Sequence, residues 1–353
     1  MSILLGNFLR AARATSDLRM VAQNQRRYYE RMKEVALSQR ALEPGEIAAM
    51  LRLPKNFRMK ERQNRLLIPV LRKLYLEIRE DRNKVNWQRM LQAFKMPAYL
   101  EEQVRSRSIR KRIVAFKTVI DIDANLKEAV ASRYLFTRNR KLQMHARLHA
   151  ARFGTSYPFK MLEEDPNLVF TDEMVVKYHN VLVYRLHSGL AMPNFIRWCN
   201  RVPVNEDLRI FAVNEIRLFR QYEDCPELLS MLQSSRDERF SCAIIQALGE
   251  LNYVPAEREF CHRYVSASFS ERQVLAQALG SINSGNPEVL NFLAEDFLQT
   301  TDYVTRMCLL RVIYDYGPQG REKFQQLKAR SHRDFAIYFE HIECNLIDSR
   351  RYA

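Results

Sequence analysis

The chain has 353 residues but only nine glycines, and it contains no run of 18 apolar residues. Scarce glycine argues against many β-turns and favours helices joined by tight connections. A helix that spans a bilayer needs about 20 consecutive apolar residues, so none is expected. The start, MSILLGNFLRAAR, lacks the basic n-region of a secretion signal. It fits an amphipathic surface helix or the remainder of a longer anchor.

The sequence also lacks the motifs of common catalytic and cofactor sites. GxxxxGK[ST], GxGxxG and GxSxG are all absent. The six cysteines form no CxxC and no close pair, which indicates small buried side chains in a reducing cytosol. His145 and His149 lie four residues apart in HARLH without the glutamate of the HExxH zinc motif, so we expect two half-exposed helix residues. We therefore predict a non-enzymatic protein with no cofactor, no metal and no small-molecule substrate.

What the chain does have is a regular spacing of prolines in its C-terminal part. Six of the twelve prolines are separated by 35, 33, 29, 32 and 31 residues: Pro158, Pro193, Pro226, Pro255, Pro287 and Pro318. Each follows an apolar stretch of helical period and opens a shorter one, and proline is tolerated in the first turn of a helix. A period of about 30–35 residues is typical of a helical solenoid, in which helix pairs bury their apolar stripes by stacking on their neighbours.

The longer first helix of each pair is predicted to begin near residues 105, 138, 171, 205, 236, 270, 302 and 332. QALGELN (246–252) and QALGSIN (277–283) are the clearest internal match, offset by 31 residues. Their small residues predict close packing of two helices, and glycine is expected to end each helix without a Cβ penalty. One buried stripe is predicted in the fourth pair from Leu208, Phe211, Ala212, Ile216 and Phe219.

Residues 1–100 do not show the repeat. A long basic helix is predicted over residues 1 to about 40, with breaks at Pro44 and Pro54. Apolar residues at helical spacing predict a second helix over 61–80, and a short helix over Trp87–Phe94 is expected to end near Pro97. We expect residues 1–100 to be a basic helical N-terminal cap or docking segment and residues 101–353 to be the repeat domain.

The string SSRDERFSCAIIQALGELN resembles a HEAT-like repeat of the bacterial type, and FSERQVLAQALGSIN and TDYVTRMCLLRVIYDYG look like further copies. This resemblance covers residues 105–348 and implies an all-α, HEAT-like α-solenoid of about seven helix pairs with a non-repeat helical N-terminal cap. The whole layout is similar to HEAT-repeat proteins of Bacteroidota-type bacteria. The segments that carry this similarity are RKLYLEI, PNFIRWCNR, LRIFAVNEIRLFRQYED and FEHIECNLI. Proteins of that group often carry an N-terminal membrane anchor and are encoded beside membrane glycosyltransferases; this chain departs from them in showing no complete anchor.

Positive charge is concentrated in the first half of the chain. Residues 1–160 carry a net charge of +21 and residues 161–353 a net charge of −6, which give the +15 of the whole chain. In RSRSIRKR (105–112) and RNRK (138–141), cations stand where acids usually begin a helix, and they oppose the helix dipole. We predict that an anionic partner contacts these cations and the basic helix at 26–33, while a solvated surface without a partner is the alternative. The predicted site residues are Arg26, Arg27, Arg31, Arg105, Arg107, Arg110, Lys111, Arg112, Arg138, Arg140 and Lys141.

The predicted function is a non-catalytic protein–protein interaction scaffold in the cytoplasm, either free or peripheral at the inner face of the membrane. The resemblance implies a membrane enzyme of envelope polysaccharide synthesis, such as a glycosyltransferase, as protein partner, and an anionic lipid surface is a further candidate. The alternative function is nucleic-acid binding by a HEAT-like protein of the DNA-glycosylase kind. It is less favoured because PELLSMLQ has no cation and PEVLNFLAEDFL is acidic, and because Trp198 has the apolar neighbours of a core residue.

Overall fold

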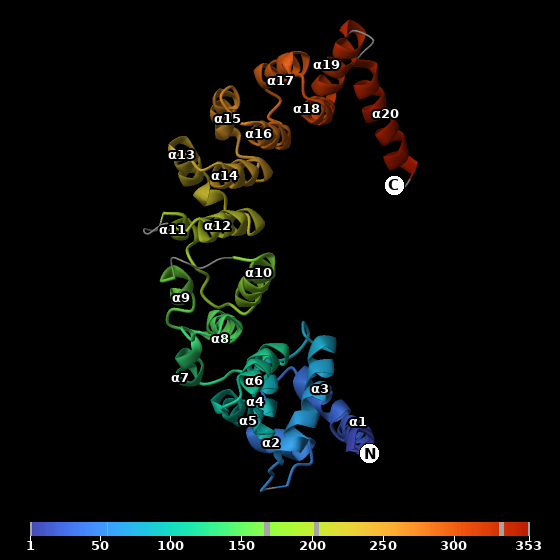
Figure 1. Ribbon diagram of the computed structural model, residues 1–353, viewed down its shortest axis with the longest axis vertical. Coiled ribbons are helices and arrows are strands. Elements are labelled where there is room, and N and C mark those ends of the chain that lie inside the picture. The colour runs from blue at the N-terminus through green and yellow to red at the C-terminus, as the bar shows by residue number, and fades with distance from the viewer. Residues whose placement is uncertain (1, 55, 166–169, 201–204, 332–334, 352–353) are drawn as a thin grey trace. The chain divides into compact units, whose positions relative to one another are not determined.

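The computed structural model describes residues 2–54, 56–165, 170–200, 205–331 and 335–351, and it describes side chains between residues 11 and 344 of these ranges (Figure 1). Helices are the regular secondary structure throughout these ranges, and no strand occurs in them, which confirms the all-α prediction. Two compact units are present, one of residues 1–161 with 180–192 and the other of residues 162–179 with 193–353. The predicted division at residue 100 stays a prediction.

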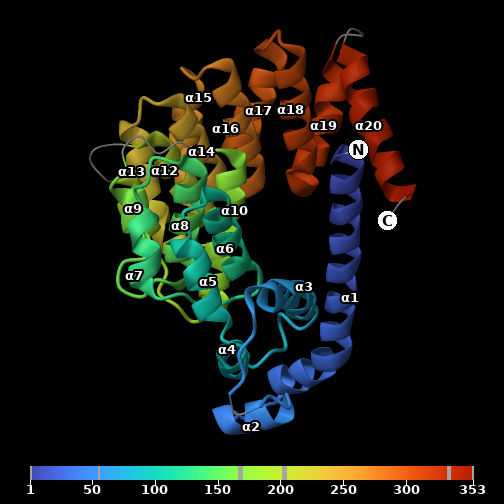
Figure 2. The same cartoon turned by 60° about the horizontal axis from the view of Figure 1, so that its bottom comes forward.

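The first unit begins with the predicted long helix, α1 (Ser2–Leu37), which packs against α3 and α4 (Figure 2). Apolar residues of α1 join one continuous core that extends from Tyr28 to Ala146. Helix α6 packs against α5 and α8 in this unit. The helices after α1 are α2 (Pro44–Met50), α3 (Glu61–Glu77), α4 (Lys84–Ala93), α5 (Met96–Arg105), α6 (Ile109–Asp121), α7 (Glu128–Ala131), the 3₁₀ turn η1 (Ser132–Tyr134) and α8 (Arg140–Phe153).

Two prolines that were expected to break or end helices begin helices instead. Pro44 opens α2, where the Glu46 carboxylate accepts the Glu43 N–H at 2.8 Å. Pro97 lies in the first turn of α5, a helix that the sequence analysis missed. Lys95 adopts a left-handed φ of 54° between α4 and α5, so the chain turns sharply there and starts a new helix at once. Both prolines occupy first-turn positions, where an N–H has no partner within the helix.

In the second unit the second helix of a pair is clearly shorter than the first in α12/α13 and α14/α15, but α17 is nearly as long as α16 and α19 is longer than α18, so the predicted alternation of length does not extend through the unit. Helix α12 packs on α14, α14 on α16, α16 on α18 and α18 on α20, in chain order (Figure 1). The second helices α15, α17 and α19 also contact one another in sequence. The elements are α11 (Phe195–Cys199), α12 (Glu206–Leu218), η2 (Tyr222–Asp224), α13 (Cys225–Ser234), α14 (Glu238–Glu250), η3 (Val254–Ala256), α15 (Glu257–Tyr264), α16 (Phe269–Ile282), α17 (Pro287–Gln299), α18 (Tyr303–Asp315), α19 (Gly317–Arg330) and α20 (Ala336–Arg351). Two further helices, α9 (Lys160–Glu163) and α10 (Asp172–His187), are divided between the units, and α10 contributes residues 180–187 to the first.

Polar capping residues explain why the first helices begin where the sequence predicts. The observed starts are Ile109, Arg140, Asp172, Glu206, Glu238, Phe269 and Tyr303. In six of these helices the side-chain oxygen of the N-cap residue accepts a hydrogen bond from a first-turn N–H that has no partner within the helix. The N-cap residues are Ser108, Asn139, Asn205, Asp237, Ser268 and Asp302. Some predictions lie outside the described residues. They are the helix start near residue 332, Arg201 of PNFIRWCNR, and the side chains of residues 1–10 and of residues 345–347 in FEHIECNLI.

The repeated glycines allow close helix packing, as predicted. A Cβ built on Gly249 would lie 2.7 Å from Cα of Ala278, and one built on Gly280 would lie 2.7 Å from a methyl group of Val312. The expectation that these glycines end their helices is wrong, because α14 continues to Glu250 and α16 to Ile282. The left-handed conformation that closes each string is taken by its asparagine instead, with φ of 54° at Asn252 and 42° at Asn283.

Several side chains differ from their predicted exposure. His145 and His149 were expected to be half-exposed, but both are buried because they lie on the apolar face of α8 with Leu142 and Ala146. Phe219 is only half-buried, although the other members of its predicted stripe are buried. Trp198 lies in the core, as predicted.

The cysteines are all free thiols, which agrees with the absence of a disulfide framework. Cys199 and Cys225 are buried, and burial raises the pKa of the Cys199 thiol to about 12 and that of Cys225 to about 11. Such thiols act as small apolar side chains rather than as reactive thiolates. Cys242, Cys261 and Cys308 are half-buried and Cys344 is exposed, so the prediction of buried cysteines holds fully only for Cys199 and Cys225.

Candidate anion-binding site

Five of the eight predicted cations of the repeat region lie in the first turns of two helices that pack on each other. We define all eight as the cationic ridge: Arg105, Arg107, Arg110, Lys111, Arg112, Arg138, Arg140 and Lys141. Arg110, Lys111 and Arg112 lie in the first turn of α6, and Arg140 and Lys141 lie in the first turn of α8. Helices α6 and α8 are in contact within the first unit. These first-turn cations oppose the positive end of each helix dipole, at a cost of roughly 0.3–1 kcal/mol each.

Arg105 is an exception to the predicted dipole conflict. It occupies the last turn of α5, where a cation favours the local dipole, and its guanidinium lies 3.9 Å from the Glu101 carboxylate. Arg107 follows in the connection between α5 and α6. The dipole argument therefore holds for α6 and α8 but not for Arg105.

Some members of the ridge already have partners inside the protein. Lys111 forms an ion pair with Glu61 at 3.2 Å. Arg112 is half-buried, donates to the Ser106 carbonyl at 2.5 Å and lies over the Tyr134 ring. The ridge members that are exposed and form no salt bridge within the described part of the chain are Arg107, Arg110, Arg138, Arg140 and Lys141. These side chains are available to an external anion.

The predicted cations of α1 form a separate group. Arg26 and Arg27 are exposed, Arg31 is half-buried, and Arg27 lies over the Tyr28 ring at 5.1 Å. Their helix packs mainly on α3 and α4, whereas the ridge belongs to α5, α6 and α8. The two groups share the first unit but belong to different helices.

A second cationic feature, buried in the first unit, centres on Asp123. This residue follows α6 with a left-handed φ of 52°, which aspartate tolerates better than most residues. Its carboxylate accepts hydrogen bonds from Arg82 at 2.6 Å and from Arg152 at 3.0 Å, and all three side chains are less than one-tenth exposed. Arg152 also donates to the Tyr75 hydroxyl at 3.2 Å. Two buried guanidinium groups therefore share one carboxylate.

The surroundings of this cluster keep its charges in place. Burial alone would lower the pKa of Arg152, but the charge of Asp123 and the phenol groups of Tyr75 and Tyr184 outweigh burial and raise it. Burial raises the pKa of Tyr184 to about 12, so its phenol stays neutral beneath the Arg152 guanidinium, which lies 3.8 Å from the ring centre. Arg152 therefore stays charged in a place where water is largely excluded.

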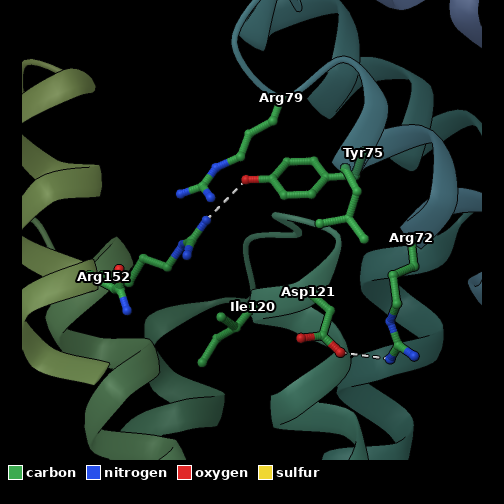
Figure 3. Close-up of a pocket in the computed structure, with 8 residues that line it drawn as sticks. Arg72, Tyr75, Arg79, Ile120, Asp121 and Arg152 are labelled. Carbon is green, nitrogen blue, oxygen red and sulfur yellow. Dashed lines mark hydrogen bonds and ion pairs between the residues drawn. The ribbon is translucent and has the colours of Figure 1, made fainter. Parts of the chain in front are cut away.

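Beside the cluster lies a pocket of about 440 Å³ (Figure 3). Its lining comes from α3 and the turn after it, α6, the end of α8 and the second half of α10, all within the first unit: Arg72, Tyr75, Leu76, Arg79, Ile120, Asp121, Arg152 and Asn180. Arg72 donates to Asp121 at 2.6 Å. In Figure 3 the guanidinium groups of Arg79 and Arg152 both reach toward the Tyr75 hydroxyl.

Arg185 fixes the end of α8 that carries Arg152. Its guanidinium is 1% exposed and donates to the carbonyl groups of Ala151 at 2.9 Å and Gly154 at 3.0 Å. Those carbonyls lie at the C-terminus of α8, where backbone oxygens lack helical partners. This contact joins the second half of α10 to α8 and so positions the wall of the pocket.

The pocket residues were missed from the sequence. Arg152 does carry a weak signal, since it stands three residues after His149 on the apolar stripe of α8, where a surface arginine is not expected. Asp123 lies 29 residues from Arg152 and 41 residues from Arg82 along the chain, so spacing could not have brought them together.

No protein-family model matches the chain, and no curated protein is significantly similar to it. Within the described ranges, no helix is both long enough and apolar enough to cross a bilayer. The same ranges contain no group of three or more His, Cys, Asp or Glu side chains that could hold a metal ion.

Proposed function

We propose that the protein is a non-catalytic interaction scaffold of the HEAT-like α-solenoid type, with about seven helix pairs and a helical N-terminal cap. The packing of α12, α14, α16, α18 and α20 on one another in chain order, and of α15, α17 and α19 in the same way, supports this proposal. Such arrays offer extended surfaces for protein partners. The resemblance to Bacteroidota-type HEAT-repeat proteins extends the proposal to a membrane enzyme of envelope polysaccharide synthesis as partner, met at the inner face of the membrane.

The observation that carries the proposal is the set of exposed ridge cations without salt bridges in the described structure: Arg107, Arg110, Arg138, Arg140 and Lys141. Most of these oppose a helix dipole, so they weaken the helices slightly and add nothing to the core. An acidic protein surface would offset them, and long-range attraction would speed the encounter. We place the contact on the cationic ridge, with the α1 arginines as its extension.

The test is a quadruple charge reversal in the full chain: Arg107→Glu, Arg110→Glu, Arg138→Glu and Arg140→Glu. The fold should persist because these side chains are exposed and a glutamate suits a helix start. Partners would be captured from solubilised membranes with the wild-type protein and identified. Binding of the purified partner should then weaken more than tenfold in the reversal variant.

A matched control reverses four exposed arginines of the second unit: Arg197, Arg236, Arg258 and Arg330. It changes the net charge by the same amount, so binding should stay within about twofold of the wild type if position matters. Equal loss in both variants would show a response to net charge alone and would remove the ridge from the proposal.

Two further measurements address the other anionic partners. Co-sedimentation with vesicles of phosphatidylcholine and phosphatidylserine measures lipid binding, and filter binding to DNA and RNA over a salt series measures nucleic-acid binding. Submicromolar nucleic-acid affinity near physiological salt, with a steep salt slope, would replace the scaffold by the nucleic-acid alternative. Vesicle binding lost in the ridge variant, without a protein partner, would replace the acidic protein by a lipid surface.

A further inference from the structure

The pocket beside Asp123 has more positive charge than the protein neutralises. Arg72 is paired with Asp121 at the pocket wall. Behind the wall, the single carboxylate of Asp123 serves both Arg82 and Arg152. The pairs therefore leave one buried guanidinium charge without a carboxylate of its own.

Arg79 adds a second uncompensated charge to the same pocket. It lines the pocket, is exposed, and its guanidinium forms no salt bridge in the described part of the chain. Only its backbone carbonyl is engaged, by a hydrogen bond from Arg82. With Arg152, it gives the pocket an excess of about two positive charges. The charge of Arg152 is buried, and electrostatic attraction is stronger there than in bulk water.

The cluster also has more donors than acceptors. The Nε group of Arg152, which lines the pocket, is buried and has no hydrogen-bond partner within the described part of the chain, and the same holds for Nε of Arg82 behind it. Buried polar groups are ordinarily satisfied, and unsatisfied ones at a cavity indicate a missing acceptor. The unpaired positive charge favours an anionic ligand, and the unpaired N–H donors favour a ligand with several acceptor oxygens.

We propose that this pocket binds the phosphate group of a small organic phosphate. Arginine recognises phosphate through parallel hydrogen bonds from its planar fork. Arg79 lies in the turn after α3 and Arg152 lies near the end of α8, so the two guanidinium groups come from different segments of the chain. The volume of about 440 Å³ is larger than a phosphate ion needs and lies in the range of small-molecule sites. Leu76, Ile120 and the Tyr75 ring supply apolar surface for the organic part, and Asn180 supplies a further polar contact.

This site is independent of the proposed scaffold function. It uses residues of α3, the turn after α3, α6, α8 and α10, and none of them is a member of the cationic ridge. A scaffold whose ridge fails its test could still bind phosphate here. The two proposals therefore fail or succeed separately.

The phosphate group could come from a soluble metabolite or from a lipid headgroup, and two probes distinguish these sources. Glycerol 3-phosphate, titrated into the full chain by calorimetry at constant ionic strength, represents the soluble source. Vesicles of phosphatidylcholine with phosphatidic acid, measured by co-sedimentation, represent the lipid source. We expect saturable binding of one equivalent of glycerol 3-phosphate, and inorganic phosphate should compete with it.

Arg79→Gln is the decisive variant, because its guanidinium is exposed and holds no salt bridge in the described structure. It should weaken phosphate binding at least tenfold with no change in circular dichroism. Arg110→Gln removes an exposed ridge charge from the same unit and should alter binding less than twofold. Arg152→Lys keeps the buried charge but loses the planar fork, so it should fold and bind at least fivefold more weakly.

The outcomes separate cleanly. Vesicle binding that depends on Arg79, with no binding of glycerol 3-phosphate, supports the site and assigns it to a lipid headgroup. Equal weakening by Arg79→Gln and Arg110→Gln would overturn the proposal, because it would show attraction to net charge rather than a site. Absence of saturable binding of both probes to the wild-type chain would overturn it as well.

Discussion

Asp123 and Arg152 are joined by a hydrogen bond of 3.0 Å in a place where both side chains are almost fully buried. Asp123 is at the same time 2.6 Å from a guanidinium nitrogen of Arg82. This carboxylate is therefore the counter-charge for two buried cations that come from different parts of the chain. The stability of the first unit and the charge of its pocket both depend on it.

We expect Asp123→Asn to destabilise the protein by about 3–5 kcal/mol, because it leaves two buried guanidinium groups without a counter-charge. Asparagine has nearly the same shape and tolerates the left-handed φ of 52°, so backbone strain does not contribute. Urea unfolding followed by circular dichroism measures the effect. Asp121→Asn is the control, since its pair with Arg72 is about 40% exposed and should contribute less than about 1 kcal/mol. Equal losses in the two variants would mean that the Asp123 cluster is not buried as described.

Gly249→Ala should destabilise the second unit by about 1–2 kcal/mol, since overpacking outweighs the better helix propensity of alanine. The added methyl group would lie 2.7 Å from both Cα and Cβ of Ala278, and α14 and α16 would have to move apart. Thermal unfolding of the purified variant measures the loss. Gly45→Ala makes the same change in α2, where no atom lies within 4 Å of the new Cβ, and stability should be unchanged or slightly higher. If both variants behave alike, the close approach of α14 and α16 is not real.

The positions of the first helices could be predicted because their signals are local. Asn205, for example, accepts the Leu208 N–H at 2.9 Å, and Asp237 accepts the Phe240 N–H at 2.7 Å, each over three residues. The prolines predicted the positions of the second helices for the same reason. Pro97 was expected to end a helix, but it lies in the first turn of the next one. Proline cannot lie deep inside a helix, yet it fits a helix start as well as the residues after a helix end.

The two candidate sites also differ in how far local sequence could predict them. The exposed cations of the ridge are adjacent in sequence, so RSRSIRKR and RNRK could be recognised by composition alone. The pocket could not be predicted without the fold, because Arg79 follows α3, Asp123 follows α6 and Arg152 lies in α8, and these helices come together only through the packing of α6 on α3 and on α8. Burial of Arg152 also depends on Tyr184, whose ring covers it at 3.8 Å and which lies in α10. No short-range pattern contains that information.

Acid should destabilise the first unit through His149. Burial, and to a smaller degree the charge of Arg152, lowers the pKa of His149 to about 4, against an ordinary value of 6.5 in the unfolded chain. The unfolded state therefore binds the proton first as the pH falls, so stability is complete above about pH 6.5 and is lost progressively down to about pH 4. The two pKa values set this loss at roughly 3 kcal/mol.

Comparison of the wild type with His149→Leu isolates this contribution from that of the carboxylates. Leucine fills a similar volume between Phe116 and Phe153 and cannot take up a proton. In urea unfolding at a series of pH values, the variant should lose roughly 3 kcal/mol less than the wild type between pH 7 and pH 4. His262→Leu, at an exposed position, should follow the wild-type curve. Parallel curves for the wild type and His149→Leu would show that the imidazole is not held neutral by burial, because both proteins would then bind the same number of protons on unfolding.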